Sequence, residues 1–166
     1  MKIKNENNKL IVTDFDEIES YIIACKIEED GIHFYKKLQE VEKSPEILKT
    51  IDFLIKEEQK HLKIFNSRLY ELRENSDNDY DENDLLTSMD YGIFKPYKDA
   101  EGLKKAINNE KRVLSFGIII ENKSIEYYMV LSKNVSESKA KSEIANIIKE
   151  EEHHKELLEE LLKKIV

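Results

Sequence analysis

The feature of this sequence that most constrains its fold is an internal repeat without gaps. Its offset is the 93 residues that separate Glu28 from Glu121. The same offset aligns residues along both copies: Ile32 with Ile125, Tyr35 with Tyr128, Leu38 with Leu131, Ile51 with Ile144, Ile55 with Ile148, Glu58 with Glu151 and His61 with His154. The chain is therefore expected to contain two related structural units.

Each unit has apolar residues at steps of three and four, which is the spacing of an amphipathic helix. Residues 14–42 form the first predicted helix, with Thr13 or Asp14 as its cap, and Ser44-Pro45 marks the start of a second that runs to about Arg73. A third is expected over 99–133, and a fourth from Ser136 or Ser138 to the C-terminus. We therefore predict an all-α protein, an antiparallel four-helix bundle made of two helical hairpins, 14–74 and 99–166.

The two hairpins are joined by residues 75–98, which we expect to be a long, solvated crossover within a single domain spanning 1–166. The segment from Glu74 to Asp84 holds six acids and no base, and the whole chain has a formal charge of −8. A negative balance argues against a nucleic-acid partner, which calls for a basic face. No apolar run approaches the ~20 residues of a membrane span. We expect a cytoplasmic protein that contacts no membrane.

The matched Glu and His residues lie on the helix faces that should be core. The face through Glu58 also collects Ile51, Leu54, Ile55, His61, Leu62 and Phe65. In the last helix, Glu150-x-x-His153 and Glu151-x-x-His154 both fit a three-residue spacing. The face of Glu151 is otherwise apolar, whereas that of Glu150 meets Glu143 and Glu160. Glu151 and His154 are therefore the predicted inward pair.

The predicted core thus contains four carboxylates and two imidazoles at one depth: Glu28, Glu58, His61, Glu121, Glu151 and His154. Burying an unpaired charge costs several kcal/mol, and no Lys or Arg lies on these faces nearby. A single Glu-x-x-His is more often a solvated helix face, but the duplicated, in-phase pattern favours a metal site. Two divalent ions would balance four carboxylates, and this donor set suits iron or manganese.

The segments ACKIEEDGIHFY (24–35), EEQKH (57–61), GIIIENKSIEYY (117–128) and EEEHH (150–154) resemble the ferritin-like domain of rubrerythrins. The resemblance covers both hairpins. It implies that the six residues above are di-iron ligands, that Glu58 and Glu151 bridge the two metals, and that Tyr35 and Tyr128 hydrogen-bond to the ligands. It also implies reduction of hydrogen peroxide or O2, or oxidation of ferrous iron.

Two departures from the family pattern point to its short members. The rubredoxin-like domain needs paired CxxC motifs, and this chain has one cysteine, Cys25, which we expect to be a buried core thiol. Rubrerythrins usually carry a further ligand Glu one turn after the first ligand of the third helix, and Ser124 stands there. The closer resemblance is to rubrerythrin-like proteins without a rubredoxin domain.

Three functional hypotheses remain at this point. The first is a di-iron oxidoreductase that acts on H2O2 or O2 in oxidative stress and is reduced by a separate rubredoxin-like protein. The second is an iron-handling module without turnover, and the third is a structural bundle with no metal. Fe–Mn or Mn occupancy is an alternative to two irons. We expect a homodimer.

Overall fold

The structure is a computed structural model, and it describes residues 2–6, 9–13, 16–76 and 110–165. The described residues form four long helices: α1 (Glu17–Val41), α2 (Pro45–Glu74), α5 (Glu110–Asn134) and α6 (Ser138–Lys164). The described helices confirm the all-α class and the two predicted helical hairpins. The predicted helix start at 99 and the acidic crossover 75–98 lie largely outside the described residues.

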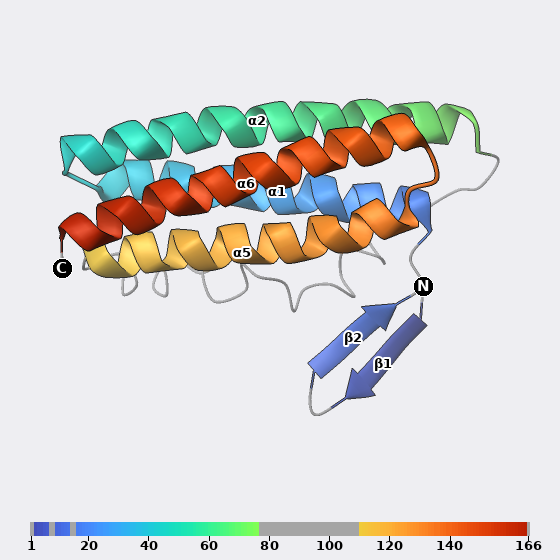
Figure 1. The fold of residues 1–166 in the computed structure, drawn as a ribbon, viewed down its shortest axis with the longest axis horizontal. Coiled ribbons are helices and arrows are strands. Elements are labelled where there is room, and N and C mark those ends of the chain that lie inside the picture. Colours follow the sequence, from blue (N-terminus) through green and yellow to red (C-terminus); the bar gives the residue numbers. More distant parts are fainter. Residues whose placement is uncertain (1, 7–8, 14–15, 77–109, 166) are drawn as a thin grey trace.

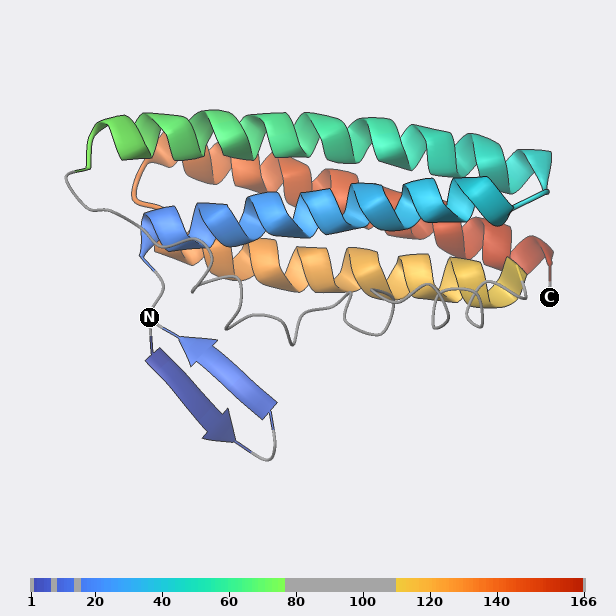
Figure 2. The ribbon, with the colours of Figure 1, turned by 180° about the vertical axis from the view of Figure 1, so that it is seen from behind.

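The helices form an antiparallel bundle (Figure 1). Helix α1 packs mainly on α2, and α5 mainly on α6; the two hairpins then meet through α1 against α5 and α2 against α6. The view from behind shows the same arrangement, with α2 and the described part of α5 starting at the same end of the bundle (Figure 2). Every pair of packed neighbours is therefore antiparallel.

The start of α1 differs from the sequence prediction. The cap is Asp16, not Thr13 or Asp14, since Thr13 belongs to a strand and residue 14 lies outside the described part. The Asp16 carboxylate accepts from the Glu19 backbone N–H at 2.8 Å, and the Glu19 side chain accepts from the Asp16 N–H at 3.1 Å. This reciprocal capping box satisfies two donors that a helix start otherwise leaves unpaired.

An N-terminal β-hairpin precedes the bundle and was not predicted. Strands β1 (Lys2–Glu6) and β2 (Lys9–Thr13) pair antiparallel, with Ile3 opposite Val12. Neither strand alternates between apolar and polar residues, since β1 (KIKNE) has one apolar residue and β2 (KLIVT) has three in a row. In both ribbon views the hairpin projects from the bundle near the start of α1.

The buried apolar residues fall into two clusters. One holds Ile18, Tyr21, Cys25, Phe65, Leu131 and Ile144 among others. The other holds Phe34, Leu38, Ile51, Leu54, Leu114 and Leu158 among others. Along every helix the matched Glu lies between residues of the first cluster and residues of the second. The bundle is thus apolar toward both ends and polar in its middle. None of the described helices combines the length and apolar character that a membrane span requires.

Candidate metal centre

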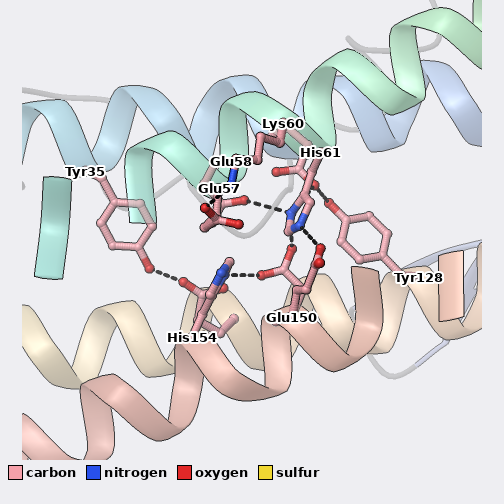
Figure 3. Close-up of polar contacts among 11 residues, drawn as sticks. Tyr35, Glu57, Glu58, Lys60, His61, Tyr128, Glu150 and His154 are labelled. Atoms are coloured by element: carbon pink, nitrogen blue, oxygen red, sulfur yellow. Dashed lines mark hydrogen bonds and ion pairs between the residues drawn. The ribbon is translucent and has the colours of Figure 1, made fainter. Parts of the chain in front are cut away.

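All six residues that sequence analysis placed in the core meet in the middle of the bundle. Their exposed fractions are 2% for Glu28, 4% for Glu58, 0% for His61, 0% for Glu121, 0% for Glu151 and 1% for His154. One residue comes from α1, one from α5, and a Glu-x-x-His pair from each of α2 and α6. Figure 3 shows His61 and His154 pointing inward from these two helices. Their ring centroids are 5.7 Å apart.

The donor atoms form two overlapping groups. One group is Glu28, Glu58, His61 and Glu151; the other is Glu58, Glu121, Glu151 and His154. Within each group the four donor atoms lie within 4.8 Å of one another. Glu58 and Glu151 belong to both groups, so each would contribute to both metal positions if two ions were bound. The role of these residues as ligands stays a prediction, but the fold supplies both positions.

Three buried donor atoms in this cluster have no hydrogen-bond partner: His61 Nδ1, Glu121 Oε2 and Glu151 Oε1. Buried polar atoms are normally satisfied, because leaving one unpaired costs about 1–3 kcal/mol. His61 Nδ1 also lies 3.1 Å from Glu151 Oε1 and 3.6 Å from Glu58 Oε2. A cation between these oxygen and nitrogen atoms would satisfy all three, so the residues present fit a metal ion.

Comparison with known proteins identifies the family of this chain. A family model described as Rubrerythrin matches residues 22–162, which is most of the chain. The chain belongs to the rubrerythrin family. No curated protein matches it. A crystal structure described as a ferritin-like diiron-carboxylate protein from Thermotoga maritima shares 21% identity, with a TM-score of 0.71, over 94% of this chain and 100% of that one. The bundle therefore has the ferritin-like fold, as the sequence indicated.

Two tyrosines close this rubrerythrin-family cluster at opposite ends. The Tyr35 hydroxyl on α1 donates to Glu121 on α5, and the Tyr128 hydroxyl on α5 donates to Glu28 on α1 (Figure 3). Both tyrosines are fully buried. Burial, followed by the nearby carboxylate charges, raises the pKa of both phenols well above the ordinary value. Each phenol therefore keeps its proton and orients one carboxylate, as the resemblance implies.

Burial and the charge of Glu58 raise the pKa of Glu28 well above its ordinary value, and the same two causes act on Glu121. Burial also acts to raise the pKa of Glu151, but interactions with His154 and His61 outweigh it and lower that pKa to about 2. Burial acts to lower the pKa of His61, yet Glu151 and Glu58 outweigh it and raise the pKa to about 10. The metal-free cluster thus holds protons where a divalent ion would supply positive charge.

One contact at the edge of the cluster was missed by sequence analysis. Glu150, which was assigned to the rim, lies 2.8 Å from His61 Nε2 through its Oε2 atom. Its repeat equivalent, Glu57, is paired instead with Lys60 on its own helix. The signal in the sequence was one of the two positions at which the motifs differ, Lys60 in EEQKH and His153 in EEEHH.

The remaining candidates lie where they were expected. Cys25 is buried at 7% exposure, with its thiol 3.5 Å from Asn66 Oδ1, which confirms a core thiol. His153, which the sequence placed outside the inward pair, is exposed. Ser124 is 5% exposed on α5, one turn after Glu121, so the position that carries a further ligand in much of the family is a buried hydroxyl here.

Proposed function

We propose that this chain is a di-iron oxidoreductase of the rubrerythrin type, which reduces hydrogen peroxide or O2 while Fe(II) is oxidised. The observation that carries the proposal is the pair of four-donor groups that share Glu58 and Glu151. Four carboxylates and two imidazoles form a mixed oxygen and nitrogen donor set of the kind that suits iron or manganese. Two irons bound there would supply one electron each to the oxidant.

The protein contributes to this chemistry by positioning the donor residues and by excluding bulk water. Glu28 and His61 complete one metal position, and Glu121 and His154 complete the other. The Tyr35 hydroxyl donates a hydrogen bond that restricts rotation of the Glu121 carboxylate. The Tyr128 hydroxyl does the same for the Glu28 carboxylate. The apolar clusters on both sides keep bulk water from the donors. The sequence holds one cysteine and no CxxC motif, and the proposal includes a separate electron donor such as a rubredoxin-like protein.

The test is to load the protein with two equivalents of Fe(II) per chain without oxygen and then add H2O2 or O2. We expect a near-ultraviolet absorbance band of the oxidised centre, bleached by a chemical reductant and regenerated by fresh oxidant over several cycles. Glu58→Ala, which removes a shared carboxylate, should abolish iron uptake. If the parent protein takes up no iron, the metal centre itself is refuted.

A second candidate, iron handling without turnover, is favoured by one specific observation. Ser124 supplies no carboxylate at the position where most of the family has an additional ligand. Under this alternative the band forms once after oxidation and does not recycle with reductant, and iron is released to a chelator. The cycling experiment therefore separates the two functions with one sample.

A further inference from the structure

The two rim carboxylates Glu57 and Glu150 are related by the internal repeat but have different partners. Glu150 reaches across from α6 to α2, where its Oε2 atom lies 2.8 Å from Nε2 of His61. Glu57 forms an ion pair with Lys60, which lies one turn later on the same helix, α2. Figure 3 shows Glu150 beside the His61 ring, whereas Glu57 lies next to Lys60 on α2. The repeat is thus broken at the edge of the metal cluster.

The break coincides with one of the two sequence differences between the matched motifs. The residue three places after Glu57 is Lys60, whereas the residue three places after Glu150 is His153. The Lys60 ammonium pairs with Glu57 along their own helix, where Glu57 is partly buried. His153 is 3.9 Å from Glu156 and is not paired with Glu150. The Glu150 side chain is therefore left to turn toward the facing helix.

The two cluster histidines consequently have different surroundings on the side away from the cluster. His61 has a carboxylate on Nε2. Within the described part of the chain, no carboxylate is paired with Nε2 of His154, and the Phe53 ring stands edge-on to the His154 ring, with centroids 5.8 Å apart. A carboxylate that accepts from one ring nitrogen fixes the orientation of the imidazole and leaves the other nitrogen as a stronger metal donor.

In His61 that other nitrogen faces the cluster. Its Nδ1 atom lies 3.1 Å from Glu151, 3.6 Å from Glu58 and 3.7 Å from Glu28. We propose that Glu150 is a positioning residue that makes the two metal positions unequal, so that the position of His61 binds a divalent ion first and more tightly than the position of His154. This inference rests on the proposed function, because it concerns the same metal centre.

The experiment is an oxygen-free titration of the metal-free protein with Co(II), followed by visible absorbance and by calorimetry. The parent should bind Co(II) in two resolved steps. Glu150→Ala should weaken the tighter step about 10- to 100-fold, which is the usual cost of losing such a partner. Glu57→Ala is the matched control and should leave both steps within about twofold, since among the described residues Glu57 pairs with Lys60 and with neither cluster histidine. Far-ultraviolet circular dichroism of both variants should match the parent.

Two further variants assign the steps. His61→Ala should remove the tighter step, and His154→Ala should remove the weaker one and retain the tighter one. Two equal steps in the parent, or equal losses from Glu150→Ala and Glu57→Ala, would overturn the inference and leave the proposed function standing. No Co(II) binding in the parent would refute the metal centre and with it both proposals.

Discussion

The two helical hairpins, α1–α2 and α5–α6, are nearly identical toward the centre of the bundle and different at its edge. Each supplies one lone Glu, one Glu-x-x-His pair and one tyrosine that hydrogen-bonds to the other hairpin. At the edge, among the described residues, only the second hairpin contributes a carboxylate, Glu150, that contacts the cluster histidine of the other hairpin. In the first hairpin, Arg68 forms a hydrogen bond to Glu143 of the second. The matched residues at the centre supply the proposed ligands. The contact of Glu150 with His61 at the edge is the difference that we propose makes the two metal positions unequal.

The largest expected effect comes from removing the carboxylates that both positions share, one from each hairpin. Fe(II) added without oxygen should stabilise the parent by ~4 kcal/mol at a thousandfold excess over its dissociation constant. For a chain of this size that is a rise of ~10 °C in the unfolding midpoint. The double variant Glu58→Gln/Glu151→Gln should show no such rise in a thermal melt. A retained rise would mean that the shared oxygens are not ligands.

Sequence reasoning recovered the inner symmetry because burial and charge conflict there. Glu58 and Glu151 lie in phase with apolar residues, and that conflict is visible in a single sequence. The rim could not be recovered in the same way. Whether Glu150 reaches His61 depends on side-chain direction across two helices and on competition from Lys60. Periodicity records neither of these. The β-hairpin was missed because neither of its strands, KIKNE and KLIVT, shows the alternation that indicates a strand.

The next effect is a dependence of metal-free stability on pH. Burial and the charge of Glu58 raise the folded pKa of Glu28 and of Glu121. Contacts with Glu151 and Glu58 outweigh burial and raise the folded pKa of His61 to about 10. A raised folded pKa contributes stability at low pH that is lost as the pH climbs through it. Between pH 6.5 and 9 the metal-free protein should therefore lose ~1.4 kcal/mol per pH unit for each proton retained only by the folded state.

Urea unfolding at several pH values measures this slope. Glu28→Gln and Glu121→Gln come from different hairpins and should flatten it equally, because the same burial and the same Glu58 charge act on both. Unequal flattening would show that the asymmetry of the edge extends into the core. A metal-free protein that gains stability from pH 6.5 to 9 would contradict the assigned directions altogether.

The two tyrosines give the next comparison. Tyr35→Phe removes the hydroxyl that holds Glu121, and Tyr128→Phe removes the one that holds Glu28. A hydrogen bond to a charged group contributes ~2 kcal/mol, or more than tenfold in affinity. In the Co(II) titration Tyr128→Phe should weaken the step assigned to His61, and Tyr35→Phe the step assigned to His154. Both variants acting on one step would contradict the assignment of the donor groups.

The smallest effect concerns Arg68, a position at which the second hairpin has no arginine. Arg68 Nε lies 2.8 Å from Glu143 on α6, and its Nη1 lies 2.8 Å from Glu71. The repeat equivalent of Arg68 is Leu161, so Arg68→Leu makes the hairpins more alike. Its acidic partners are partly exposed, so the loss should be only ~1 kcal/mol in urea unfolding and smaller at high salt.

Lys56→Ala is the matched control, because Lys56 pairs with Asp52 on one exposed helix face. That change should alter the unfolding free energy by ~0.3 kcal/mol. If Arg68→Leu costs no more than Lys56→Ala, the contact between α2 and α6 does not depend on this ion pair. The packing of the matched apolar residues then holds the hairpins together, and the edge is free to diverge without loss of the metal site.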